Sequence, residues 1–177
     1  MNRHEASATV PASIDQVFAH LDDFARLSSH MDRASWVMAG GRMRFDFDAA
    51  RGRQVGSRIR LVGRILGIPL SVEETVTERV PPARKVWETV GEPRLLVIGS
   101  YRMGFELLPR SGGTLLRVFI EYALPSRAPF RWLGRFFGQF YAKWCTRQMI
   151  DDAIKAFASS APAGSTGHMA PEVTGDH

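Results

Sequence analysis

The sequence of 177 residues contains a single cysteine, Cys145, so it can form neither an internal disulfide nor a zinc cluster built on cysteines. It has no run of 18 or more apolar residues, which argues against a transmembrane helix. The first residues, MNRHEASATVPAS, lack the apolar stretch of a signal peptide. These absences predict a cytoplasmic protein.

Several motifs that carry chemistry are also missing from the sequence. HExxH, GxSxG, GxxxxGK[ST] and GxGxxG do not occur. The histidines show no metal-ligand spacing; they are His4, His20, His30, His168 and His177. We therefore expect no metal and no cofactor, and we interpret Cys145 as a small core residue rather than a nucleophile.

The net charge of +5 is not concentrated in any one stretch of the chain. Arginines are scattered through the sequence, no run of five or more like charges occurs, and no RNA-binding signature is found. The charge is thus typical of the solvated faces of a basic protein, and we expect no nucleic-acid partner.

What the sequence does contain is one long helical pattern, Pro129–Ser159. Its apolar residues recur at steps of three and four, and Pro129 suits the first turn of a helix. Residues 35–124, in contrast, alternate with the period of strands. A single long helix after a run of strands has to lie across the sheet to bury its apolar stripe.

The predicted elements follow a distinctive order. A strand at His4–Thr9 precedes a helix opened by a capping box of Ser13 and Gln16, and a second short helix spans Phe24–His30. Six strands in series then predict an antiparallel meander: Ser35–Arg44 continued by Phe45–Ala49, Gly56–Ile65, Leu70–Arg79, Lys85–Val90 ended by Gly91-Glu92-Pro93, Leu95–Leu108, and Thr114–Leu124. We expect one domain over residues 1–159 and a disordered tail over residues 160–177.

Three stretches resemble the SRPBCC superfamily, the START-like group that includes polyketide cyclase/dehydrase and lipid-transport proteins. They are ATVPASIDQVFAHLDDF, VEETVTERVPPARKVWETV and MGFELLPRSGGTLLRVFIEYALP, within a resemblance over about residues 4–158. The resemblance implies an α+β helix-grip fold, a curved antiparallel sheet of about seven strands in β-α-α-β6-α order around a long C-terminal helix. It also implies a hydrophobic cavity between sheet and helix that often holds a lipid or polyketide.

Glu74 is the one candidate for acid or base chemistry. By alternation it shares a face of its strand with Leu70, Val72 and Val76, and a carboxylate among such residues has a raised pKa. The alternatives are a bulge that turns Glu74 to solvent, or an arginine partner on a neighbouring strand.

Candidate ligand-binding residues lie on the faces expected to point inward. Phenol groups usually have a partner when buried, and aromatic and methionine side chains form an adaptable apolar wall. The candidates are Trp36, Tyr101, Met103 and Tyr122 from the strands, with Phe137, Tyr141 and Trp144 from the helix. Plain core packing is the alternative for each. We expect Phe140 and Met149 on the same wall.

The first half of the helix carries a wide apolar surface interspersed with Arg131, Arg135 and Lys143. This surface exceeds what one contact with a sheet needs. It predicts either contact with a membrane surface or with a second subunit, or simply a wide core stripe with solvated cations.

Three functions remain open from the sequence. The first is binding, and with it transport, of a hydrophobic small molecule or lipid in the internal cavity. The second is a polyketide cyclase/dehydratase-like enzyme that uses the same cavity, in which orientation of the substrate supplies much of the rate. The third is a partner- or membrane-binding module that acts through the long helix.

Overall fold

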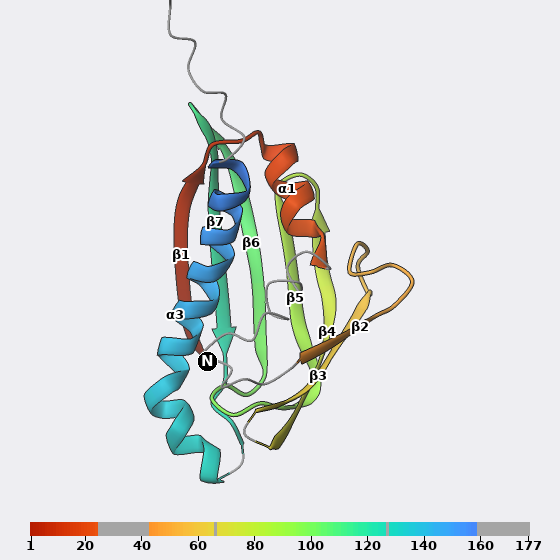
Figure 1. Cartoon of the computed structure of the whole chain (residues 1–177), viewed down its shortest axis with the longest axis vertical. Coiled ribbons are helices and arrows are strands. Elements are labelled where there is room, and N and C mark those ends of the chain that lie inside the picture. The colour runs from red at the N-terminus through yellow and green to blue at the C-terminus, as the bar shows by residue number, and fades with distance from the viewer. Residues whose placement is uncertain (25–42, 66, 127, 159–177) are drawn as a thin grey trace, which may run out of the picture.

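The computed structural model describes residues 1–24, 43–65, 67–126 and 128–158. Its described elements are one strand, a helix, six strands and a long helix (Figure 1), in the predicted order except for the second short helix, most of which lies outside the described residues. They are β1 (Asn2–Val10), α1 (Ile14–Asp22), β2 (Met43–Phe47), β3 (Arg58–Ile65), β4 (Ile68–Val80), β5 (Arg84–Arg94), β6 (Tyr101–Arg110), β7 (Gly113–Tyr122) and α3 (Ala128–Ala158).

The seven strands form one antiparallel sheet in the order β1-β7-β6-β5-β4-β3-β2. Strands β2 to β7 pair in sequence order, and β1 closes the far edge against β7. The sheet curves, with α3 lying along β1 and β7 and α1 covering one end of the same face (Figure 1). This is the predicted helix-grip architecture.

Helix α1 begins as the capping box predicts. The Ser13 hydroxyl accepts a hydrogen bond from the Gln16 N–H at 3.4 Å, and the Ser13 N–H donates to the Gln16 side chain at 3.1 Å. The helix then buries Val17, Phe18 and Leu21 against the sheet. Four backbone donors at a helix start otherwise lack partners, so this cap fixes where the chain turns from β1 into α1.

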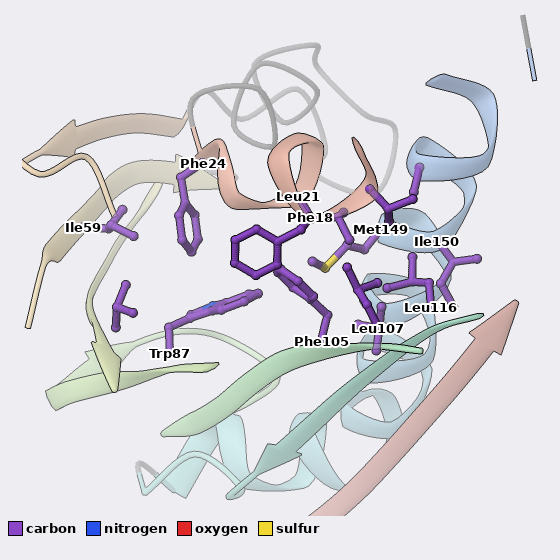
Figure 2. Close-up of a cluster of buried hydrophobic side chains, with 14 of the residues drawn as sticks. Phe18, Leu21, Phe24, Ile59, Trp87, Phe105, Leu107, Leu116, Met149 and Ile150 are labelled. Atoms are coloured by element: carbon purple, nitrogen blue, oxygen red, sulfur yellow. The ribbon is translucent and has the colours of Figure 1, made fainter. Parts of the chain in front are cut away.

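The end of the interior beneath α1 is tightly packed. The rings of Phe18 and Phe105 pack edge to face with 5.8 Å between their centroids, and those of Phe24 and Trp87 do so with 5.1 Å. Met149 of α3 is buried in the same cluster (Figure 2). The protein's own side chains therefore fill the interior at this end.

The sequence predicted two strand boundaries wrongly. Strand β5 does not end at Gly91-Glu92-Pro93 but continues to Arg94, with a register shift opposite β4 that absorbs the extra residues. Strand β6 begins only at Tyr101, whereas a strand from Leu95 was predicted. Residues 95–100 cross the end of the sheet instead, because Leu95 and Leu96 pack into the core and the Gly99 N–H donates to the Ala123 carbonyl at 2.8 Å.

Three predicted segments fall outside the described residues. They are most of the second short helix at Phe24–His30, most of the strand at Ser35–Arg44, and the tail at 160–177. The structure accordingly carries no information on Trp36 as a ligand-binding residue.

Candidate functional site

Polar side chains form a row across four neighbouring strands on the inner face of the sheet. The register pairs Glu74 of β4 with Thr89 of β5, and Tyr101 of β6 with Tyr122 of β7. The Tyr101 N–H donates to the Thr89 hydroxyl at 3.1 Å, which joins β6 to β5 at this level. Residues far apart in sequence are thus brought to one height within an otherwise apolar surface.

Glu74 occupies the most enclosed position of this row. Its side chain is 6% exposed and lies on the same strand face as the buried Leu70, Val72 and Val76. Burial raises the pKa of the Glu74 carboxyl to about 7, while a hydrogen bond that the Tyr101 hydroxyl donates to it acts in the opposite direction.

No cation compensates Glu74 among the residues that the structure describes. Arg60 is exposed on the neighbouring strand β3, and Arg102 on β6 lies 3.7 Å from Glu121. The inward orientation derived from strand alternation therefore holds, without a bulge that would turn Glu74 to solvent and without an arginine partner.

Two further polar groups reach this region from α3. Tyr141 and Cys145, four residues apart on the helix, share a side-chain hydrogen bond. The pKa of Tyr141 lies well above its usual value because of Cys145, burial and the nearby Glu74 carboxyl. Burial raises the pKa of Cys145 to about 12, so the thiol stays protonated at neutral pH and is a poor nucleophile.

A hollow opens at the end of the sheet where residues 95–100 cross. It has a volume of about 420 Å³, and its wall includes Leu70, Leu95, Leu96 and Ser100. Leu70 lies four residues before Glu74 on one face of β4, a separation of about 13 Å along a strand. The hollow thus lies further along the sheet than the polar row, and none of Glu74, Thr89, Tyr101 and Tyr122 is part of its wall.

A second hollow, of about 440 Å³, lies on the other side of residues 123–126. Tyr122 and Arg131 contribute to its wall. Both hollows therefore lie where β7 leaves the sheet and α3 begins.

The predicted binding residues differ in burial and in position. Tyr101, Met103 and Tyr122 lie on the inner face of the sheet, and Tyr141 and Trp144 are partly buried on α3, with their rings 5.9 Å apart. Phe137 is 51% exposed, so its placement on the cavity wall is wrong. The same holds for Phe140, at 64%, and Met149 packs in the core beneath α1 instead.

Glycines explain why Phe137 and Phe140 point outward. Gly134 and Gly138, one helical turn apart, are the buried residues in this part of α3. A Cβ atom at Gly134 would lie 2.8 Å from the Val97 carbonyl oxygen, and one at Gly138 would lie 3.1 Å from the same atom. The helix approaches the backbone through its glycines, which leaves the aromatic residues on its other sides.

A second buried polar cluster, which sequence reasoning missed, lies at the α1 end. Arg79 donates two hydrogen bonds to the Asp22 carboxylate, at 3.1 and 2.8 Å, and the fully buried Lys85 ammonium donates a third at 2.7 Å. Burial alone would raise the pKa of Asp22, but these hydrogen bonds hold it below its usual value. No sequence motif marks this cluster, since its members are up to 63 residues apart.

The described residues contain no group of three or more His, Cys, Asp and Glu side chains placed to hold a metal ion. Helix α3 and the shorter α1 are both too short or too polar to cross a membrane. The polar groups that the geometry brings together are therefore a carboxyl, three phenols and a thiol.

Comparison of structures shows the same fold in other proteins. TTHA0849 from Thermus thermophilus is 16% identical, with a TM-score of 0.60 over 92% of this chain and all 100% of that one. A norcoclaurine synthase point mutant from Thalictrum flavum, in complex with a transition-state analogue, is 14% identical, with a TM-score of 0.59 over 90% and 95%. Ara h 8.0201 is also 14% identical, with a TM-score of 0.58 over 90% and 96%.

At these identities the similarity shows the fold alone. By sequence, none of the curated proteins matches the chain. The family model described as polyketide cyclase / dehydrase and lipid transport, in contrast, matches residues 1–161. The predicted resemblance is thereby confirmed, and the chain belongs to this family of the SRPBCC superfamily.

Proposed function

We propose that this protein binds an apolar small molecule or lipid between the sheet and α3, with one polar group of the ligand at Glu74 and Tyr101. The observation that carries the proposal is the enclosed Glu74 carboxyl, whose one hydrogen-bond partner among the described residues is the Tyr101 phenol, with a hollow that begins at Leu70, about 13 Å along the same strand face. A buried carboxyl normally has further partners, because its desolvation is costly. A ligand donor would supply one.

The burial of the inner residues supports an unfilled space. Tyr101, Met103 and Tyr141 are only partly buried, although they lie between the sheet and the helix or next to it. A hollow of about 420 Å³ at this end falls within the range of roughly 300–1,000 Å³ found for small-molecule sites. Family membership points to the same class of ligand.

The first test identifies what the protein retains. Native mass spectrometry of protein purified from its own host, followed by solvent extraction, is expected to release an apolar molecule. For protein stripped of ligand, the fluorescent probe ANS should bind and be displaced by the extracted molecule, and that molecule should raise the melting temperature.

A matched pair of variants localises the site. Ser100→Trp places a bulky ring in the wall of the hollow, whereas Ser111→Trp places the same ring on the exposed turn between β6 and β7. We expect the first variant to lose ANS binding and the second to keep it. Equal ANS binding by both variants would show that the hollow is not the binding site.

Enzymatic activity of the cyclase/dehydratase type is the second candidate, favoured by the pKa of Glu74. A carboxyl with a pKa of about 7 is divided between its acid and base forms at neutral pH, as a general acid or base requires. It would take a proton from a carbon next to a ligand carbonyl and return one to a departing hydroxyl, which leaves as water.

Glu74→Gln separates the two functions, because the amide keeps a hydrogen-bonding group but cannot transfer a proton in this way. An enzyme would lose turnover of the extracted ligand class while binding persisted. A binding protein would show no turnover in either form and a changed affinity only.

A further inference from the structure

The first half of α3 has its polarity reversed relative to an ordinary surface helix. Its buried side consists of small residues, Gly134, Gly138 and Ala142. Its exposed side carries large aromatic residues: Trp132 is 58% exposed, Phe136 72%, Phe137 51% and Phe140 64%. A soluble protein normally places such residues the other way round, so this face is expected to have a partner.

The aromatic residues form one continuous stripe. Trp132, Phe136 and Phe140 follow one another at intervals of four residues, which places them on one side of a helix. The rings of Trp132 and Phe136 pack edge to face, with 6.3 Å between their centroids. We call Trp132, Phe136, Phe137 and Phe140 the aromatic stripe.

The charged residues on the first half of α3 have one sign. Arg131, Arg135 and Lys143 are exposed on the same half of the helix. The sequence from Tyr122 to Ile150 contains five Arg and Lys residues and no Asp or Glu. A partner for this face should therefore be apolar and anionic at once.

We propose that the first half of α3 docks on the surface of a membrane that contains anionic lipids, with the aromatic stripe in the headgroup region. Helices that lie in this way combine aromatic or leucine residues with Lys and Arg, and the cations add attraction to anionic headgroups. No described helix can span a bilayer, so the contact is with its surface.

A second copy of the chain is a poorer partner. A twofold dimer through the stripe would bring Arg131, Arg135 and Lys143 of both copies together without an acidic residue between them. Uncompensated like charges at an interface oppose association. An anionic lipid surface supplies the missing negative charge.

The position of the stripe suits this role. The first turns of α3 project beyond the ends of β1 and β7, at the bottom of the view in Figure 1. Arg131 also lines the hollow of about 440 Å³ beside residues 123–126. The proposal stands on the outer face of α3 and does not require that the interior binds a ligand.

The test is sedimentation of the full chain with lipid vesicles. At low salt the protein should bind vesicles of phosphatidylcholine and phosphatidylglycerol, bind vesicles of phosphatidylcholine alone much less, and dissociate as salt is added. On binding, the fluorescence of Trp132 should shift to shorter wavelength, and Trp132→Phe should remove this shift.

Paired variants distinguish vesicle binding through the aromatic stripe from nonspecific adsorption of the protein. Phe136→Gln with Phe140→Gln should weaken vesicle binding by about tenfold or more, whereas Val90→Gln with Leu108→Gln, at residues 38% and 45% exposed on strands, should not. Arg131→Gln with Arg135→Gln should weaken binding by about thirtyfold at low salt, since each cation contributes near the surface. Arg60→Gln with Arg64→Gln on β3 is its control.

Three outcomes would overturn the proposal. One is absence of binding to anionic vesicles at low salt. Another is equal binding by the stripe variants and their controls. The third is a dimer in sedimentation velocity that the stripe variants dissociate, which would assign the face to a second copy.

Discussion

Two carboxylates, those of Asp22 and Glu74, are buried among the residues that the structure describes, and their surroundings differ in kind. Asp22 receives three hydrogen bonds from Arg79 and Lys85, which join α1 to β4 and β5. Glu74 receives one hydrogen bond, from the neutral Tyr101 hydroxyl. The first arrangement satisfies the charge of its carboxylate within the protein, whereas the second leaves hydrogen-bonding capacity of the carboxyl unused. Saturation of the local bonds is thus what separates a structural cluster from a candidate site.

The largest expected effect comes from breaking the satisfied cluster. Asp22→Ala leaves the buried Lys85 ammonium and the Arg79 guanidinium without their anion, and losing one partner of a buried pair costs about 3–5 kcal/mol of unfolding free energy. Urea unfolding measures this loss. Asp46→Ala, at an exposed ion pair with Arg44, is the control and should cost far less. Equal losses would show that Asp22 is not the centre of the cluster.

The next effect is a difference in pH dependence. The pKa of Glu74 is raised from 4.5 to about 7, so the folded state holds this proton more tightly than the unfolded state. Its stabilising contribution is present below pH 4.5 and is lost as pH rises toward 7, by about 3 kcal/mol.

Glu74→Gln should remove that loss, which urea titrations across this pH range would detect. Asp22 should act in the opposite sense, because its pKa is lowered: its contribution is present at neutral pH and is lost as pH falls through the pKa of the folded state. Parallel curves for wild type and Glu74→Gln would contradict the enclosure of Glu74.

A smaller effect follows from removing the phenol. Tyr101→Phe leaves Glu74 without its hydrogen bond, which should cost about 2 kcal/mol where Glu74 is ionised. It should also raise the pKa of Glu74 further, since this hydrogen bond lowers it. Tyr122→Phe on the neighbouring strand is the matched control. If both variants left the pH dependence unchanged, Tyr101 would not be a partner of Glu74.

The smallest effect is expected on the solvent-exposed face of the sheet, at Arg3 of β1. Arg3 forms ion pairs with Glu5 and Glu121 at 3.1 and 3.0 Å. Lys85 also makes two polar contacts, both with Asp22, but those are buried whereas the contacts of Arg3 are exposed to solvent. Arg3→Ala should therefore cost less than about 1 kcal/mol, and added salt should reduce the difference. A larger cost would mean that the number of contacts, rather than burial, distinguishes the two clusters.

Local patterns in the sequence were sufficient for the fold. The capping box at Ser13, the alternation of β4, β6 and β7 and the period of α3 each depend on neighbouring residues only. Alternation also placed Glu74 and Tyr101 inward correctly. It could not show that they meet, because their contact depends on the register of β4, β5 and β6 together.

The errors have a common physical origin. Apolar residues were assumed to face the core, but at Gly134 and Gly138 the close approach of α3 to Val97 decides which side is buried. The apolar segment from Leu95 packs into the core without being a strand. The sequence indicated no role for Asp22, Arg79 and Lys85, because only the folded chain brings them together.

We propose that Glu74, an enclosed carboxyl for which no described residue supplies a compensating cation, is available to a ligand. The most direct measurement is a pH titration of the glutamate side-chain carboxyl signals by carbon-13 NMR, with the Glu74 signal assigned from the Glu74→Gln variant. A titration midpoint of about 7 is expected for Glu74 in the ligand-free protein. A midpoint near the ordinary value of 4.5 would show that the carboxyl is solvated or paired, and would contradict the account.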